Sequence, residues 1–206
     1  MRKTIICLSL NLLTISSFAQ TAVLKETFDD NRNGWLDKPY RDTSINASIA
    51  GGVLQIANNN KDSNWSYTIR QKIDEQKDFE IQLRFMIKEG TNKTRSYGSL
   101  YWGGDDSQAN TWVLFSQRRI KVKNCLGGDH KSDQIFQKNN SPSLKKGVFY
   151  QLVIRKQDKI YKVLLDGSLL FELPFQSFKG DNISFAAGKF TTVAFDDLKI
   201  FYSNSK

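Results

Sequence analysis

Two carboxylates near the ends of the chain have the sequence setting of cation ligands. Glu26 lies in segment 24–28 (Leu-Lys-Glu-Thr-Phe) and Asp196 in segment 193–200 (Val-Ala-Phe-Asp-Asp-Leu-Lys-Ile), and both segments alternate like strands. Residues two apart on a strand share a face, so the alternation places both carboxylates on the apolar side. A carboxylate there is costly unless it is paired, hydrogen-bonded or bound to a metal. The pattern predicts that the chain ends meet around a cation, or that backbone, Lys or Arg donors satisfy both groups.

Aromatic and cationic side chains at polar-facing strand positions suggest a second site. Trp112 alternates with apolar neighbours, Tyr97 and Tyr101 share one strand face, and Arg84 lies on the polar face of the most regular strand. Sugar rings stack on exposed aromatic rings while polar groups bind the hydroxyls. If these strands are neighbours, the four residues form a glycan-binding platform. The alternative is that the rings cover a sheet edge or belong to the core.

Nucleophile and metal chemistry that depends on histidine has little support. His130 is the single histidine, so a zinc site with several histidine ligands is excluded, and a catalytic triad would have to use it. It lies in a Gly-rich loop, which is typical of a solvated side chain. Cys125, close by, has the setting of a small half-buried residue. Asp105-Asp106 follows two glycines and is typical of a loop turn. We predict no catalytic residue.

The elements that would position these side chains are β-strands throughout. Alternation is clearest from Phe79 to Ile87, where every second residue is apolar, and Asp166-Gly167 between two apolar runs predicts a hairpin. No segment of ten residues keeps a helical apolar stripe. We therefore predict an all-β, two-sheet antiparallel β-sandwich. Its predicted strands are 24–28, 52–57, 65–71, 78–88, 97–103, 111–116, 119–123, 133–137, 148–157, 159–165, 168–173, 182–188 and 191–202.

The first residues have the pattern of a secretory signal peptide over 1–19. Arg2-Lys3 precedes a short apolar stretch, and Ser17-Phe18-Ala19 offers a cleavage site. Cleavage would leave one domain, residues 20–206, with Cys125 as its one thiol and a net charge of +7, because 28 basic and 21 acidic residues remain. No later stretch is long enough to cross a bilayer. We expect an exported protein, periplasmic, cell-surface or extracellular, whose basic surface favours acidic glycans or serves solubility.

Several motifs together resemble the concanavalin A-like lectin/glucanase superfamily. They are Glu-Thr-Phe-Asp-Asp at 26–30, Gly52-Val-Leu, Tyr-Gly-Ser-Leu-Tyr-Trp-Gly at 97–103, the Asp-Gly hairpin and the closing Phe-Asp-Asp-Leu-Lys-Ile at 195–200. The resemblance covers most of residues 23–202 and implies a jelly roll of two curved sheets. In the laminarinase-like branch it also implies a structural Ca²⁺ held by Glu26, the carbonyl near Gly52 and Asp196. This fold hosts lectins, glycosidases and lyases, so the resemblance does not supply a function.

The catalytic motifs of the resembled enzymes are missing. The Glu-x-Asp-x-x-Glu run of the retaining glycosidases is absent, and Gln134-Ile135-Phe136 has Phe where the lyases have His. We predict a secreted non-catalytic module that binds a polysaccharide or cell-surface glycan, with no specific nucleic-acid partner. The alternatives are a diverged glycan-active enzyme, either a glycoside hydrolase or a polysaccharide lyase, and a structural envelope domain that binds another protein. The sequence leaves the oligomeric state open.

Overall fold

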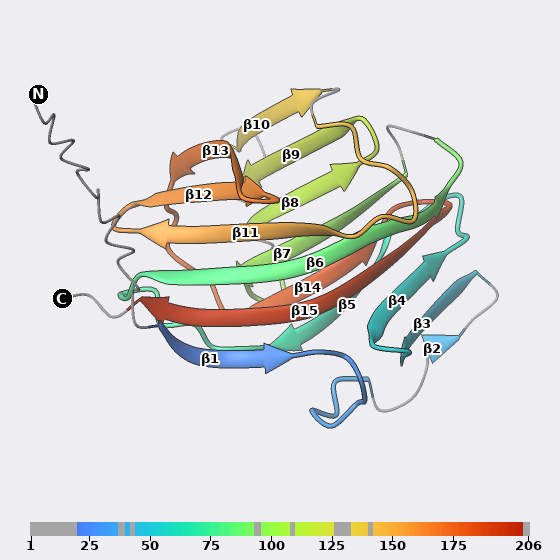
Figure 1. Cartoon of the computed structure of the whole chain (residues 1–206), viewed down its shortest axis with the longest axis horizontal. Coiled ribbons are helices and arrows are strands. Elements are labelled where there is room, and N and C mark those ends of the chain that lie inside the picture. The colour runs from blue at the N-terminus through green and yellow to red at the C-terminus, as the bar shows by residue number, and fades with distance from the viewer. Residues whose placement is uncertain are drawn as a thin grey trace, which may run out of the picture.

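The computed structural model describes residues 20–36, 40–41, 44–92, 96–107, 110–125, 133–139 and 142–203. These residues form fifteen strands and no helix, and therefore no helix that could span a membrane. The strands make two antiparallel sheets, which confirms the predicted all-β sandwich (Figure 1). The predicted signal segment and His130 lie outside the described residues.

The larger sheet has nine strands: β1 (Gln20–Glu26), β2 (Tyr40–Arg41), β3 (Ile45–Ala50), β4 (Val53–Asn58), β6 (Phe79–Gly90), β11 (Tyr150–Gln157), β12 (Ile160–Leu165), β13 (Ser168–Pro174) and β15 (Thr191–Ser203). The smaller sheet has six: β5 (Trp65–Arg70), β7 (Tyr97–Gly104), β8 (Thr111–Ser116), β9 (Arg119–Asn124), β10 (Gln134–Asn139) and β14 (Asn182–Ala187).

The order of strands joins distant parts of the chain. The nine-stranded sheet runs β13-β12-β11-β6-β15-β4-β3-β2, and the six-stranded sheet runs β10-β9-β8-β7-β14-β5. β1 and β4 pair with different parts of the same edge of β15. The first strand therefore lies beside the last (Figure 1). The prediction that the chain ends meet is confirmed.

The core lies between the sheets and follows from alternation. The apolar face predicted on β6, from Phe79 to Ile87, is buried at every second residue. Phe85 on β6 stacks on Phe115 of β8 with ring centroids 3.6 Å apart, which joins the two sheets. Trp102 of β7 and Tyr161 of β12 make a second link, through a 3.1 Å hydrogen bond that the indole N–H donates to the phenol oxygen.

Two hairpins show how turn chemistry sets register. Asp166 and Gly167 both have positive φ, 45° and 78°, and join β12 to β13 as predicted. Gly51 and Gly52 have φ of 60° and 75° and join β3 to β4. This hairpin was not predicted, because no strand was predicted between residues 28 and 52.

A β-bulge interrupts β15 where its edge partner changes. Glu26, the end of β1, pairs with Leu198, whereas Leu54 of β4 pairs with Phe195. Between these points the register against β6 shifts, and Asp197 has a φ of 52°. The bulge resets the alternation, so residues 193 and 195 face the core before it and residues 198 and 200 after it.

Candidate functional site

The outer surface of the six-stranded sheet brings most of the predicted ligand-binding residues together. Directly paired residues of antiparallel strands share a face. Tyr101 pairs with Trp112, which pairs with Lys123, and on the other side Tyr101 pairs with Ser184. We call this surface the six-strand face. Its outward positions are Ser66, Thr68, Arg70, Tyr97, Ser99, Tyr101, Trp112, Leu114, Ser116, Arg119, Lys121, Lys123, Ile135, Gln137, Asn139, Asn182, Ser184 and Ala186.

Two rings lie together at the centre of this face. The Tyr101 and Trp112 ring centroids are 5.9 Å apart and the planes are tilted by 44°. Both side chains are half-buried, so part of each ring remains open to a ligand. The inward neighbours Val113 and Phe115 are buried, which confirms the predicted outward orientation of Trp112.

A third ring extends the row along β7. Tyr97 lies four residues before Tyr101 on the same face, about 13 Å away at the rise of an extended strand. Its ring packs directly on Gly188, where an added Cβ would lie 2.8 Å from two ring carbons. Burial raises the pKa of Tyr97 to about 12 and also raises the pKa of Tyr101. Both phenols are therefore protonated donors in neutral solution.

Cations line the neighbouring strand. Arg119, Lys121 and Lys123 alternate along β9 and face outward beside the rings. The ammonium nitrogens of Lys121 and Lys123 lie 5.4 and 6.0 Å from the Trp112 ring centroid, within reach of a cation–π contact. Burial, and after it the charges of Arg119 and Lys123, lowers the pKa of Lys121.

The row of rings ends in a hollow on each side. The hollow at the Tyr101 end has a volume of about 390 Å³, and Thr68, Asp105, Asp106 and Ser184 are in its wall. The hollow at the Tyr97 end has a volume of about 570 Å³, and its wall includes Lys61, Arg119, Lys189 and Phe190. Together with the rings between them, these hollows outline an extended site along β7.

Arg84 does not belong to this cluster. It lies on β6 of the nine-stranded sheet, where its guanidinium forms a 2.9 Å ion pair with Asp196 and covers the Phe149 ring at 4.6 Å. The expected polar-facing position is correct, but its strand is in the other sheet. The platform predicted from four residues therefore consists of Tyr97, Tyr101 and Trp112.

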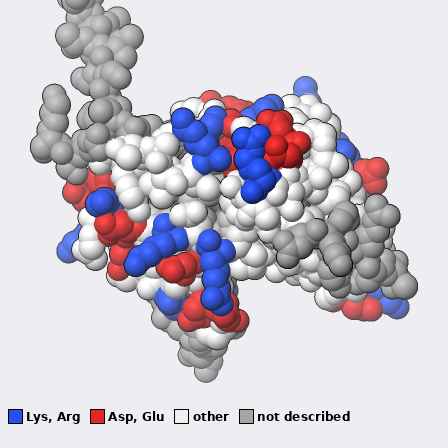
Figure 2. All heavy atoms as spheres, turned by 90° about the horizontal axis from the view of Figure 1, so that it is seen from below, with Lys and Arg blue, Asp and Glu red and all other residues white. Residues whose placement is uncertain are grey.

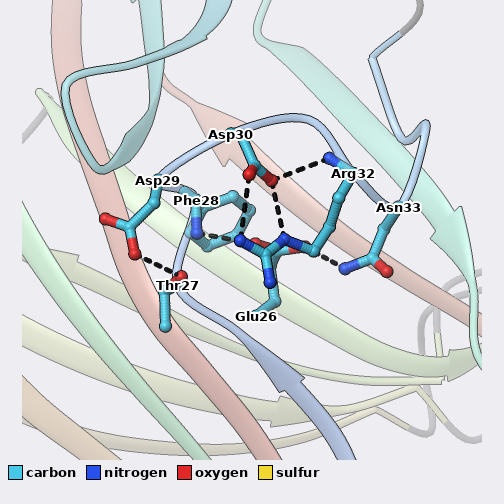
Figure 3. Close-up of polar contacts among 7 residues, drawn as sticks. All are labelled: Glu26, Thr27, Phe28, Asp29, Asp30, Arg32 and Asn33. Atoms are coloured by element: carbon cyan, nitrogen blue, oxygen red, sulfur yellow. Dashed lines mark hydrogen bonds and ion pairs between the residues drawn. The ribbon is translucent and has the colours of Figure 1, made fainter.

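Glu26 is buried as predicted, and nitrogen donors satisfy its carboxylate. One oxygen accepts a 2.6 Å hydrogen bond from the Phe28 amide, and the other accepts one from the Asn33 side chain (Figure 3). The same loop is held by a two-bond contact of Arg32 with Asp30, and Thr27 donates to Asp29 (Figure 3). These contacts match the hydrogen-bonded alternative for Glu26.

Asp196 faces away from the core, which corrects the orientation expected from alternation. The bulge at Asp197 shifts the pattern by one residue, so Asp196 lies on the outer side with Arg84. Burial raises the pKa of Asp196 although Arg84 opposes this shift. Gly52 lies near Asp29, since an added Cβ there would be 3.3 Å from the Asp29 carboxylate.

The donor set is a poor fit to the expected calcium site. Both Glu26 oxygens already accept hydrogen bonds and Asp196 pairs with a cation. Within the described part of the chain, no three acidic, His or Cys side chains are arranged to hold a metal ion. The calcium site remains a prediction.

The cations of β9 lie in the candidate site, although they were not among the predicted site residues. Their signal in the sequence is the run Arg118-Arg-Ile-Lys-Val-Lys123, in which cations alternate with apolar residues. Their pairing with Trp112 and Leu114 places them beside the rings. Cys125 is buried, and burial raises the pKa of its thiol, which makes it a weak nucleophile.

No protein-family model matches the chain, and a comparison with curated proteins gave no match. Many solved structures share its fold. A carbohydrate esterase of the Shiga toxin-encoding bacteriophage phi24B has a TM-score of 0.61 at 12% identity, over 90% of this chain and 100% of that one. An endo-β-1,4-glucuronan lyase of the fungus Trichoderma reesei has a TM-score of 0.59 at 13% identity, over 87% and 95%.

The carbohydrate recognition domain of Emp47p has a TM-score of 0.56 at 14% identity, over 84% of this chain and 93% of that one. A sialidase has a TM-score of 0.58 at 11% identity over 79% of this chain, which spans 16% of the sialidase length. At these identities the likeness shows the fold alone: a β-sandwich of the kind found in lectin-like and glycan-active proteins.

Proposed function

We propose that this chain is an exported, non-catalytic glycan-binding module of the concanavalin A-like superfamily, with its ligand on the six-strand face. The observation that carries the proposal is the pair formed by Tyr101 and Trp112, half-exposed at the centre of a polar face. Sugar rings stack on such rings through their C–H faces, while their hydroxyls need donors and acceptors at the rim. Ser184 and Thr68 supply hydroxyls next to Tyr101.

The six-strand face does not have the arrangement of a glycosidase. Hydrolysis of a glycosidic bond uses two carboxyl groups on opposite sides of the bond. None of the outward strand positions of this face is Asp or Glu. Binding without bond cleavage is the function that these side chains support.

One observation favours a diverged enzyme as a second candidate. Asp105 and Asp106 border the hydroxyl-lined hollow at the Tyr101 end. Both have other partners, because Asp105 accepts from Ser107 and Asp106 pairs with Arg70 at 2.8 Å. If the enzyme candidate were correct, purified protein would release oligosaccharides from a bound polymer, and D105N or D106N would stop the release.

Affinity electrophoresis tests the binding proposal. Residues 20–206 would be run through gels that contain neutral or acidic polysaccharides, with calcium or with a chelator. We expect retardation by at least one polymer and roughly fivefold weaker retention of Trp112→Ala, since a lost stacking contact is worth about 1 kcal/mol. A loss of retardation on chelation would also support the calcium prediction.

Phe149→Ala is the matched control, since Phe149 is a half-buried ring that lies with Arg84 on the nine-stranded sheet. It should be retarded like the unmodified protein. Equal weakening in both variants would show that Trp112 acts through stability and not through contact. No retardation by any polymer would refute glycan binding for the panel and favour the protein-binding alternative.

A further inference from the structure

The six-strand face differs from the outer side of the nine-stranded sheet because its outward strand positions include no acidic side chain. Its outward strand positions include four cations and no acidic residue. On the outer side of the nine-stranded sheet, acids and bases neutralise each other, as in the Arg155–Glu80 pair at 2.6 Å and the Lys199–Asp197 pair at 2.6 Å. In the view from below Figure 1, basic and acidic side chains likewise gather in mixed clusters (Figure 2).

Two of the four cations are already neutralised. Arg70 pairs with Asp106 and Lys123 pairs with Asp133. Lys121, in contrast, has no acidic partner among the described residues, although it lies beside the Trp112 ring. The cation of Lys121 is therefore available to a ligand that stacks on Trp112.

The hollow at the Tyr97 end adds further cations to the same row. Lys61, Arg119 and Lys189 are in its wall, and none of the described residues of the wall is acidic. Lys61 and Lys189 are exposed and make no ion pair within the described part of the chain. An extended ligand that lies along β7 would therefore pass cations from Lys121 to Lys189 while it contacts the rings.

On the other side of the rings from β9, the outward side chains of β14 and β5 are mostly uncharged. Apart from Arg70, which pairs with Asp106, these side chains are small and neutral, and the Thr68 and Ser184 hydroxyls lie 2.7 Å apart. Hydroxyl and amide groups suit the hydroxyls of a sugar chain. A single-stranded nucleic acid also stacks on rings, but its phosphate backbone is bound in a positively charged groove.

We infer that the ligand of this face is an acidic polysaccharide, oriented with its anionic groups over β9 and the Tyr97-end hollow and its hydroxyls over β14 and β5. This inference rests on the proposed function and names its ligand class. Anionic groups that replace water around Lys121 and Lys189 supply the selectivity, while Tyr101 and Trp112 supply stacking that any sugar chain could use.

The test compares each acidic polymer with a neutral form of the same chain. Alginate, polygalacturonate and hyaluronan would be used beside the methyl ester of each, with residues 20–206 as the protein. We expect retardation by at least one acidic form, at least tenfold weaker retardation by its ester, and weaker binding as salt rises from about 0.05 to 0.2 M.

A double variant identifies the cations. Lys121→Gln with Lys189→Gln should weaken binding of the acidic polymer roughly three- to tenfold, in line with partly exposed ion pairs, and leave any residual binding to the ester unchanged. Lys88→Gln with Lys162→Gln is the matched control, because it removes the same charge from the nine-stranded sheet, where Lys88 is exposed and Lys162 is half-buried. The thermal unfolding midpoints of both variants would verify that they fold.

The outcomes separate the inference from the proposed function. Equal retardation by acid and ester, or equal loss in the two double variants, would overturn the acidic ligand but leave glycan binding in place. Retardation by neutral glucans alone would do the same. Retardation by no polysaccharide would remove the proposed function, and tighter binding of oligothymidylate than of any polyuronate would reassign the face to nucleic acid.

Discussion

The phenol of Tyr97 links the six-strand face to stability at high pH. Burial raises its pKa from the ordinary 10.0 to about 12, so between these values the unfolded chain releases a proton that the folded chain keeps. Stability from this group is complete below pH 10 and is lost as the pH rises towards 12. We expect the free energy of unfolding to fall across this interval.

Tyr97→Phe should remove about 1 kcal/mol of that fall, after allowance for solvent screening. Denaturant unfolding at pH 8 and at pH 11, for both proteins, measures the difference. An identical fall in both would mean that Tyr97 titrates as a free phenol. Such a result would contradict the close packing of its ring on Gly188.

At the level of single residues, the sequence predicted orientation better than location. Alternation correctly placed Trp112 outward and Glu26 inward because each lies in an uninterrupted stretch of strand. The same rule placed Arg84 outward, yet it could not show that β6 belongs to the other sheet. Sheet membership depends on long-range pairing, which a local pattern does not encode.

The bulge in β15 holds Asp197 in a strained backbone conformation. Asp197 has a φ of 52°, a conformation that Asn and Asp tolerate and β-branched residues do not. Asp197→Val should therefore reduce the free energy of unfolding by about 1–3 kcal/mol. Asp197→Asn is the control, because it also loses the ion pair with Lys199 but tolerates the backbone angle.

Chemical denaturation of both variants gives the comparison. The Val variant should be clearly less stable than the Asn variant. If they were equally stable, the effect would come from the ion pair and the strained conformation would carry no measurable energy.

Most elements could be predicted, and the exceptions have local physical reasons. Strands such as β6 and the β12–β13 hairpin carry strong alternation and turn signals. β3, with the sequence Ile-Asn-Ala-Ser-Ile-Ala, alternates, but its Ala, Asn and Ser residues have low strand propensity, and it was missed. The orientation of Asp196 could not be predicted, because a bulge follows from the change of partner from β1 to β4, and that change is invisible in the sequence.

The whole molecule depends on contacts that hold its two sheets together. The hydrogen bond from the Trp102 indole to the Tyr161 hydroxyl is one, and it is fully buried between β7 and β12. The rings also meet edge to face, with centroids 5.8 Å apart. Tyr161→Phe would leave the buried indole N–H without its acceptor.

We expect Tyr161→Phe to cost about 1–3 kcal/mol of unfolding free energy. A double-mutant cycle with Trp102→Phe, read by denaturant unfolding, should give a coupling of about 1 kcal/mol. A coupling near zero would show that the two substitutions act separately through packing, and that the hydrogen bond adds nothing to the union of the sheets.

The central position of β15 decides when the molecule can assemble. Before β15 is present, the nine-stranded sheet consists of three unconnected pieces: β1, the β2–β4 meander, and the group of β6 with β11–β13. β14 has the same role in the other sheet, since it alone joins β5 to β7. Both strands follow all the others in the order of the described chain, so both sheets close only after their remaining strands have been synthesised. Until both strands have emerged, the other strands have open edges, and we therefore expect folding to be late and slow.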